Sequence, residues 1–268
     1  MALVLRSFYN TYHWLFHEYQ DPRIVQYPLT SSPMLIIGLI TWYVYFVTVW
    51  GQHFMKTRPA YELNNIIQIY NFLQIILNLF MGSYAGYYAY WKQTINLSCG
   101  ANDPTNDSYE MRQIIFASYV YYICKIIDLL DTVFFVLRKK NNQITFLHVY
   151  HHAGMVAATF VYIKFLNGSH GTLLGVINSY VHVIMYGYYF LTSYRPEMKN
   201  SLWWKKHITQ LQLIQFGILV IHFLNPILFF DCQWPKYISL IGVIQNTFMF
   251  ILFLDFYIKA YVRKPKQQ

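Results

Sequence analysis

MLIIGLITWYVYFVTVWGQ, residues 34–52, is the stretch that decides the kind of fold open to this chain. It carries no charged side chain, and its length is close to the roughly 20 helical residues that cross the hydrocarbon core of a bilayer. Similar apolar segments follow it over residues 66–90, 114–137, 144–165, 171–193, 208–230 and 237–260. Together these segments predict an all-α membrane protein with seven transmembrane helices.

The composition agrees with a membrane-embedded chain. Of the 268 residues, 56% are hydrophobic and only 12% are charged, whereas soluble domains average about 25% charged residues. No repeat, low-complexity stretch or linker marks a second domain. We therefore expect one membrane domain, with a lumenal N-terminal segment over residues 1–33, a seven-helix bundle over 34–260 and a cytosolic tail over 261–268.

The distribution of Lys and Arg predicts the orientation of the bundle. Twelve of these residues lie after the first, third and fifth spans or at the C-terminus, and six lie on the other side. Cytosolic loops carry the excess of positive charge, so we expect a cytosolic C-terminus and a lumenal N-terminus. The net charge of +9 thus reflects membrane topology rather than nucleic-acid binding, and it also suits a phosphate-bearing ligand.

The loop after the second span has features of a lumenal segment. It contains glycosylation sequons that begin at Asn96 and Asn106, and such sequons are acceptors only on the lumenal side. Cys99 in this loop and Cys232 in the last lumenal loop face an oxidising compartment, where a disulfide can persist. Two unpaired thiols are the alternative, since spacing alone does not show that the two residues meet.

The expected location is the membrane of the endoplasmic reticulum. The first 32 residues lack the apolar core of a cleavable signal peptide, so the first span must act as its own membrane signal. Lys264 and Lys266 in the C-terminal tail resemble a dilysine retrieval signal. A basic, solvated tail is the alternative, and retrieval is favoured because both the position and the orientation fit.

The third span contains ionisable residues that ordinary lipid-facing helices lack. Lys125, Asp128 and Asp131 occupy two turns, and each charge near a helix centre costs roughly 2.5–3.5 kcal/mol on insertion scales. Such groups persist when they face a polar interior and partly neutralise one another. The helical spacing allows Lys125 to pair with Asp128, with Thr132 along the same stripe. These residues favour a functional site over a purely structural ion pair.

Three more spans carry polar stripes at helical spacing. The fourth span begins with three imidazoles on one face, and the fifth and sixth carry polar side chains one turn apart. The stripes consist of His148, His151 and His152, of Asn178, His182 and Tyr186, and of Thr209, Gln212 and Gln215. One polar stripe is ordinary interhelical hydrogen bonding, but four that converge describe a site.

Clustered histidines indicate either metal binding or acid–base and nucleophilic catalysis. The HxxHH spacing also occurs in membrane di-iron desaturases and hydroxylases, which need about eight histidine ligands. This chain has ten histidines, but His13 and His17 are expected on the lumenal side and no second HxxHH occurs. We therefore expect no metal. A di-iron enzyme and a non-enzymatic lipid transporter are the alternatives.

Together these motifs resemble the ELO family of very-long-chain fatty acid elongases, the 3-oxoacyl-CoA synthases. The family's KxxExxDT box matches residues 125–132, and its HxxHH box matches 148–152. Its NxxxHxxMY box matches 178–186, and its TxxQxxQ box matches 209–215. Asp128 departs from the pattern, because the family has Glu at this position.

The resemblance implies a fold and a mechanism. Six of the seven helices would enclose a narrow acyl tunnel. His151 and His182 would be the central pair, one of them taking the acyl group of a long-chain acyl-CoA as an acyl-imidazole. Malonyl-CoA would lose CO₂, and the resulting enolate would attack the acyl carbon to give a 3-oxoacyl-CoA two carbons longer. No cofactor is required, because reduction and dehydration belong to partner enzymes of the elongation cycle. Homo- and hetero-oligomers are common in the family.

The same resemblance gives the other polar residues supporting roles. Those that would orient the imidazoles or stabilise the enolate oxygen are His148, His152, Asn178, Gln212 and Gln215. Lys125, Asp128 and Asp131 would act electrostatically from further away, while Tyr186 and Thr209 complete their motifs. Basic residues at the cytosolic mouth would bind CoA phosphates, or would lie there only because cytosolic loops are positive. These residues are Arg138, Lys139, Lys140, Lys205 and Lys206.

Overall fold

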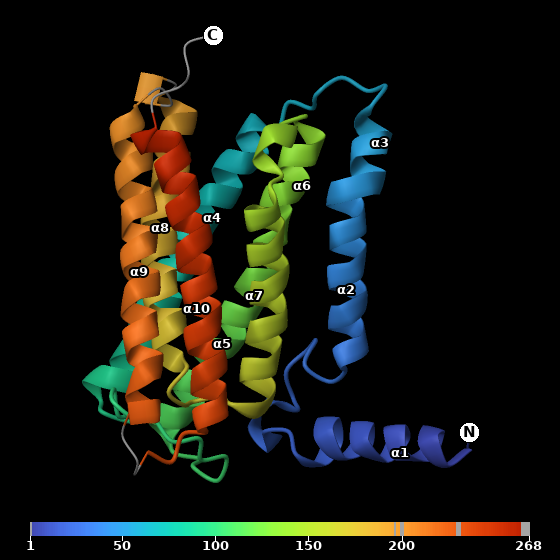
Figure 1. Ribbon diagram of the computed structural model, residues 1–268, viewed down its shortest axis with the longest axis vertical. Helices are drawn as coiled ribbons and strands as arrows, with labels where there is room; N and C mark the ends of the chain where they lie inside the picture. Colours follow the sequence, from blue (N-terminus) through green and yellow to red (C-terminus); the bar gives the residue numbers. More distant parts are fainter. Residues whose placement is uncertain (1, 196, 199–200, 229–231, 264–268) are drawn as a thin grey trace.

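The computed structural model describes residues 2–195, 197–198, 201–228 and 232–263. In this part of the chain every regular element is helical. Long helices run side by side, while α1 (Ala2–His13) lies across them at one end of the molecule (Figure 1). Lys264 and Lys266, the predicted retrieval signal, fall outside the described residues.

Each predicted span corresponds to a helical segment of the structure. In chain order these are α2 (Pro33–Tyr45) with α3 (Gly51–Met55), α4 (Asn64–Gly86), α5 (Tyr109–Ile127) with α6 (Leu129–Leu137), α7 (Phe146–Phe165), α8 (Thr172–Tyr194), α9 (Leu202–Leu228) and α10 (Lys236–Tyr257). A π-helical turn, η3 (Phe46–Trp50), joins α2 to α3, so these three elements form one continuous column.

Four segments in the described part of the chain are long and apolar enough to cross a membrane. They are Pro33–Met55, Asn64–Trp91, Leu202–Leu228 and Lys236–Val262. Several such spans confirm a multi-pass membrane protein with an all-helical fold. The segments α5–α6, α7 and α8 are not among the four, and they carry the Lys, Asp and His residues of the polar stripes. The count of seven spans therefore remains a prediction.

The distribution of side chains is the reverse of that in a soluble domain. α10 exposes Leu240, Ile241 and Ile244, whereas Lys125 and Asp128 on the α5–α6 segment are each only 2% exposed. Apolar residues outside and charged residues inside suit a chain surrounded by lipid tails, because lipid is as apolar as leucine. The bundle therefore keeps its polar chemistry in its interior.

The third predicted span is two helices rather than one. α5 ends at Ile127 and α6 begins at Leu129, with Asp128 at the junction. The Asp128 N–H donates to the Cys124 carbonyl at 2.8 Å, and the Asp131 N–H donates to the Asp128 carbonyl at 3.2 Å, so the chain tightens locally at the junction. This break occurs within the motif of residues 125–132.

Three packed pairs organise the bundle. α4 packs along α8, α9 packs along α10, and α2 packs against α7. In the α2–α7 pair, Ile36 and Tyr43 belong to the same apolar cluster as Val156 and Phe160. α5 lies between α4 and α7 and contacts both of them. The polar stripes of α5, α7 and α8 are brought together by this arrangement.

A disulfide ties the end of the bundle that bears α1. Cys99 in the segment after α4 bonds to Cys232 between α9 and α10, with the two Cα atoms 5.7 Å apart. This finding resolves the alternative of two unpaired thiols in favour of the bond. The sequon residue Asn96 nearby is exposed and Asn106 is half-buried. Use of either sequon for glycosylation remains a prediction.

A stacked pair of histidines lies beside the disulfide. The rings of His170 and His222 are 3.7 Å apart, and each Nε2–H donates to the other residue's carbonyl, at 3.0 and 2.9 Å. Pro226 lies four residues after His222 in α9 and has no N–H. The His222 carbonyl therefore lacks its usual helical donor and accepts from His170 instead. Gly100, which follows Cys99 in the chain, places its N–H 3.4 Å from His170 Nδ1.

A buried lysine fixes the segment between α1 and α2. Lys164 at the end of α7 is fully buried, and its Nζ donates to Gln20 Oε1 at 2.6 Å, to the Thr30 carbonyl at 2.9 Å and to the Ser31 carbonyl at 3.2 Å. The Asp21 N–H in turn donates to the Lys164 carbonyl at 2.8 Å. The N-terminal segment is therefore held at this end of the bundle.

Candidate active site

One small buried cavity brings three of the four polar stripes together. Its walls come from the α5–α6 segment, α7 and α8, and its volume is about 10 Å³. The lining residues are Lys125, Asp128, His151, His152, Met155 and His182. The predicted central pair, His151 of α7 and His182 of α8, thus lines a common space, whereas His148 is not among the lining residues.

The histidines of α7 lie in its first two turns. Thr145 caps this helix, since its Oγ1 accepts the His148 N–H at 3.3 Å, which is a standard helix start. The ring centroids of His148 and His152 are 4.2 Å apart, and those of His151 and His152 are 5.8 Å apart. The HxxHH spacing therefore forms a continuous imidazole surface at the beginning of α7.

Lys125 and Asp128 form the predicted ion pair beside these imidazoles. Lys125 Nζ donates to Asp128 Oδ2 at 2.9 Å, and both side chains are almost completely buried. His182 Nδ1 lies 3.4 Å from the same Nζ and 3.7 Å from Asp128 Oδ2. Because an ammonium group can only donate, His182 Nδ1 is the acceptor in this contact and its proton resides on Nε2.

Tyr186 on α8 connects the two carboxylates of the α5–α6 segment. Its hydroxyl lies 2.7 Å from Asp131 Oδ2 and 3.2 Å from Asp128 Oδ1. Tyr186 is fully buried, and the Tyr70 hydroxyl on α4 lies 3.4 Å from its own. This tyrosine, which the sequence placed one turn from His182, therefore orients the carboxylates next to the cavity.

Four further contacts involve residues of the polar stripes. Thr132 Oγ1 lies 2.9 Å from His148 Nε2 and 2.7 Å from the Tyr43 hydroxyl of α2. On the other side, the Tyr121 hydroxyl donates to Asn178 Oδ1 at 2.7 Å. Lys125 Nζ lies over the Tyr121 ring, 4.8 Å from its centroid. Asn178 therefore supports the ring beneath the lysine.

The stripe on α9 lies further from the cavity. Thr209 Oγ1 donates to the Lys205 carbonyl of its own helix at 2.9 Å, and Gln212 Nε2 lies 3.9 Å from Met185 Sδ on α8. Gln215 is buried, and its Oε1 has no hydrogen-bond partner among the described residues. In the structure this fourth stripe borders α8 rather than lining the histidine cavity.

Sequence reasoning did not assign a role to a polar stripe on α4. Tyr70, Gln74 and Asn78 recur every fourth residue and are all buried. Gln74 Nε2 donates to Asp128 Oδ1 at 2.7 Å, so α4 contributes directly to the surroundings of the ion pair. The four-residue spacing within the second predicted span was the available signal.

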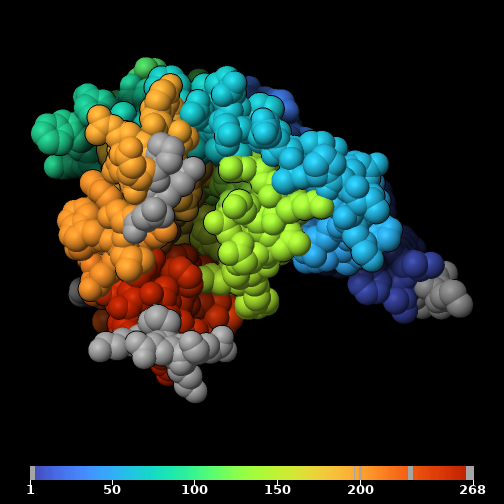
Figure 2. All heavy atoms as spheres, turned by 90° about the horizontal axis from the view of Figure 1, so that it is seen from above, coloured from blue at the N-terminus to red at the C-terminus, as the bar shows by residue number. Residues whose placement is uncertain are grey.

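The basic residues expected at the mouth lie at the end of the bundle opposite α1. Arg138 directly follows α6 and precedes the exposed Lys139 and Lys140, while Lys205 and Lys206 occupy the first turns of α9. Arg138 Nη2 donates to Asn64 Oδ1 at 3.3 Å. Figure 2 looks onto this end and shows a hollow between the yellow-green α6–α7 region and the orange α8–α9 region.

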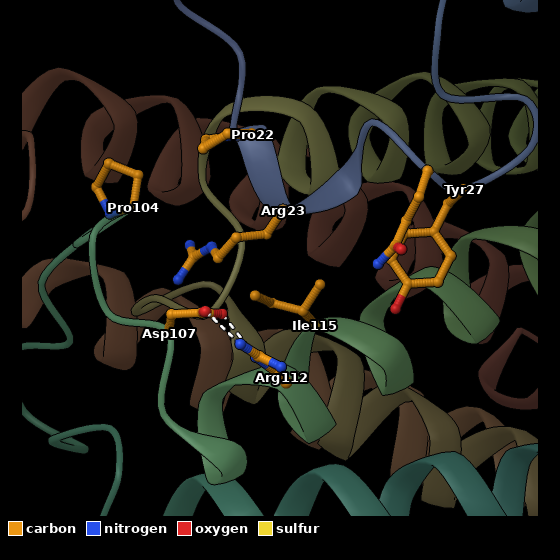
Figure 3. A pocket seen from close by; sticks show the side chains of 8 residues that line it. Pro22, Arg23, Tyr27, Pro104, Asp107, Arg112 and Ile115 are labelled. Carbon is orange, nitrogen blue, oxygen red and sulfur yellow. Dashed lines mark hydrogen bonds and ion pairs between the residues drawn. The ribbon is translucent and has the colours of Figure 1, made fainter.

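A larger cavity of about 470 Å³ lies at the end that bears α1, away from the histidines (Figure 3). Its charged side chains already have partners. Arg112 Nε donates to Asp107 Oδ1 at 2.7 Å, and this hydrogen bond lowers the pKa of Asp107 from its usual value. Arg23 is bound by Asp21 and by the Asp103 and Asn106 carbonyls. Among the described residues that line this cavity, each charged side chain therefore has a hydrogen-bond partner.

Fold and site together define a multi-pass helical membrane protein with an imidazole–lysine–carboxylate cluster in its interior. The model of the ELO: GNS1/SUR4 family matches residues 28–268. Very long chain fatty acid elongase 4 of Homo sapiens is 38% identical over all of this chain and 83% of its own length. Elongase 1 of Mus musculus is 38% identical over 95% of this chain and 90% of its own length.

A third relative, very long chain fatty acid elongase 7 of Drosophila melanogaster, is 36% identical over 97% of this chain and 78% of its own length. The chain belongs to the ELO family. The family resemblance that was inferred from the four motifs is therefore confirmed.

Proposed function

We propose that this protein condenses a long-chain acyl-CoA with malonyl-CoA in very-long-chain fatty acid elongation. The products are a 3-oxoacyl-CoA two carbons longer, CoA and CO₂. Membership of the ELO family supports the elongation role. The observation that carries the chemistry is the common cavity of His151, His152 and His182, next to the Lys125–Asp128 pair.

His151 is the better nucleophile of the central pair. Its imidazole makes no hydrogen bond to other described residues, whereas His182 Nδ1 accepts from Lys125 and its Nε2 carries the proton. An unengaged neutral imidazole is nucleophilic, and a protonated ring nitrogen is a hydrogen-bond donor. We therefore assign the acyl group to His151, and to His182 the donation of a hydrogen bond to the thioester or enolate oxygen.

The first half-reaction acylates the enzyme. The His151 nitrogen attacks the thioester carbonyl of acyl-CoA, the carbon–sulfur bond breaks, and CoA leaves as a thiol that takes the proton of the imidazole. Burial of the site keeps water away from the acyl-imidazole. His152 packs against His151 and His148, so it holds the reactive ring in place.

The second half-reaction forms the carbon–carbon bond. The carboxylate of malonyl-CoA leaves as CO₂, and the enolate that remains attacks the acyl carbon. The bond to His151 breaks, and the imidazole recovers a proton from the medium. His182 stabilises the enolate oxygen, and its own orientation depends on Lys125, Asp128 and, through Asp128, Tyr186. The reaction needs no redox cofactor, since neither half-reaction transfers electrons to or from another molecule.

The basic residues and the histidine cavity would bind different parts of an acyl-CoA. The basic residues beside the hollow in Figure 2 are suited to CoA phosphates, with the positive-inside rule as the alternative reason for their position. The histidine cavity holds about 10 Å³, far less than an acyl chain. Entry of the substrate therefore requires the surrounding side chains to move apart, and an acyl tunnel within the bundle is part of this proposal. The endoplasmic reticulum, with a lumenal N-terminus, is the proposed location.

Purified protein in lipid nanodiscs tests this function directly. With radiolabelled malonyl-CoA and a series of acyl-CoAs, we expect release of CO₂ and a product two carbons longer. With acyl-CoA alone, intact-protein mass spectrometry is expected to show one acyl group, absent from His151→Ala. His13→Ala, at the opposite end of the molecule, is the matched control. Elongation by His151→Ala at the wild-type rate contradicts the covalent mechanism.

The same preparation separates the competing functions. A di-iron enzyme would contain iron in stoichiometric amount and would consume oxygen. A transporter would move acyl chains without releasing CO₂ from malonyl-CoA. Metal analysis and the CO₂ assay therefore distinguish all three classes.

A further inference from the structure

Gln74 on α4 is a buried amide outside the four motifs. It is 1% exposed, and its Nε2 donates to Asp128 Oδ1 at 2.7 Å and to the Tyr70 hydroxyl at 3.1 Å. Its Oε1 accepts from Cys124 Sγ at 3.0 Å and from Asn78 Nδ2 at 3.2 Å. Every polar atom of the Gln74 side chain is therefore engaged.

These contacts leave only one favourable orientation of the amide. If it were reversed, Oε1 would face the Asp128 carboxylate, and the NH₂ group would face the donors of Cys124 and Asn78. Both contacts would be repulsive in a buried site, where unsatisfied polar groups are costly. Cys124 and Asn78 thus hold Gln74 so that its donor points at Asp128.

Asp128 is in turn held by three side chains, one of which is Tyr186, whose hydroxyl lies 3.2 Å from Oδ1. Lys125 binds Oδ2 from the preceding turn of α5, and Gln74 binds Oδ1 from the neighbouring helix. The carboxylate held in this way lies 3.7 Å from His182 Nδ1 and shares Lys125 with it. A displacement of the carboxylate would therefore move Lys125 and alter the contact that fixes the His182 proton on Nε2.

The length of the side chain at position 128 matters for this contact. A glutamate would carry its carboxylate about 1.5 Å further from the backbone. The 2.7 Å contact to Gln74 leaves no room for such an extension. Gln74 cannot easily retreat, because Cys124 and Asn78 hold its other end.

We propose that Gln74 is a positioning residue matched to the short side chain of Asp128, and that it keeps Lys125 and His182 in register for condensation. The inference rests on the proposed function for its catalytic consequence. It has a structural part that is independent of activity, which is the coupling between positions 74 and 128.

An exchange of both residues tests the match. We expect Gln74→Ala and Asp128→Glu each to lower kcat by about tenfold or more, with the KM for acyl-CoA changed less than threefold. In the double variant the glutamate occupies the space left by the amide, so kcat is expected within about threefold of the wild type. Gln68→Ala on the same helix is the matched control and is expected to have wild-type kcat. Its side chain is half-buried.

Thermal unfolding of the wild type, the two single variants and the double variant gives the second readout. The Tm losses of the single variants are expected to be non-additive, with the double variant more stable than their sum. If Gln74→Ala does not accumulate, Gln74→Ser takes its place in both series. A double variant no more active than the poorer single variant, or Asp128→Glu at the wild-type kcat with Gln74 present, overturns the inference.

The two proposals fail in different ways. A wild-type protein that releases no CO₂ from malonyl-CoA removes the proposed function, and the coupling of the Tm values then decides the match between Gln74 and Asp128 alone. A wild-type protein that condenses normally, with additive effects at the two positions in both readouts, removes the role of Gln74 and leaves the function intact.

Discussion

Lys125 Nζ lies 2.9 Å from Asp128 Oδ2 in the interior of the bundle, and the two side chains are 2% and 3% exposed. The pair spans the break between α5 and α6. Because both charges are shielded from water, each depends on the other for compensation. The local geometry of the histidine cavity therefore depends on this contact.

Lys125→Met is expected to destabilise the protein by about 3–5 kcal/mol, because it leaves Asp128 charged, buried and without its cation. The Tm in detergent or nanodiscs measures the loss. Lys125→Met with Asp128→Asn is expected to recover most of it, since no unpaired charge remains. Equal stability of Lys125→Met and the wild type would show that the ion pair contributes nothing.

Tyr186→Phe is expected to lower kcat by roughly 10- to 100-fold. A hydrogen bond to a charged group contributes ~1.5–3 kcal/mol, and its loss from the transition state would slow the reaction by this factor. The variant removes the hydroxyl that contacts Asp131 and Asp128 but keeps the aromatic ring. Tyr189→Phe, on an exposed part of the same helix, is the control and is expected to have wild-type kcat. Similar losses in both variants would indicate a general effect on α8.

Cys99→Ser and Cys232→Ser are expected to destabilise the protein equally, and the double variant no further, because all three lack the same bond. The disulfide spans 133 residues of sequence, and loop closure on this scale contributes about 4–5 kcal/mol in the chain-entropy account. Thermal unfolding and non-reducing electrophoresis measure the two effects. Additive losses would mean that the two cysteines act separately.

Stability is expected to fall in acid because of His170, which lies in the turn between α7 and α8. Burial lowers its pKa from 6.5 to about 4. A group with a depressed folded-state pKa binds fewer protons when folded, so its contribution is complete above pH ~6.5 and is lost as the pH falls toward ~4. Protonation also removes the acceptor that faces the Gly100 N–H.

His170→Gln is expected to flatten this dependence. The measurement is Tm at intervals from pH 7.5 to about 4.5, for the variant and the wild type together. His207→Gln, an exposed histidine on α9, is the control and is expected to keep the wild-type profile. An unchanged slope in His170→Gln would assign the acid sensitivity to other groups.

Much of the site was predictable because helical spacing is regular. The imidazoles of α7 and the pair of Lys125 and Asp128 share helix faces, and the structure places His151, His182 and the ion pair around one cavity. The bond between Cys99 and Cys232 was predictable as one of two alternatives, because both cysteines were assigned to the same side of the membrane.

Other features depend on contacts between helices that no local pattern reveals. The break at Asp128 lies within a segment long and apolar enough to span a bilayer, so the sequence predicted one continuous span over 114–137. The spacing of Tyr70, Gln74 and Asn78 marks a polar stripe, but the contact of Gln74 with Asp128 required knowing that α4 packs next to α5. The same limit applies to α9, whose polar residues had the right spacing yet border α8 rather than the cavity.

Pro226 illustrates how the absence of one backbone donor permits a contact between distant segments of the chain. By releasing the His222 carbonyl, it lets α9 join the α7–α8 turn beside a covalent cross-link. That end of the molecule is held by a disulfide and by hydrogen bonds between helices, while the opposite end bears several basic side chains beside a hollow. If the protein acts on a long-chain acyl-CoA, as proposed, we expect the side-chain movements that admit the acyl chain to occur at this basic end, where the CoA phosphates would bind.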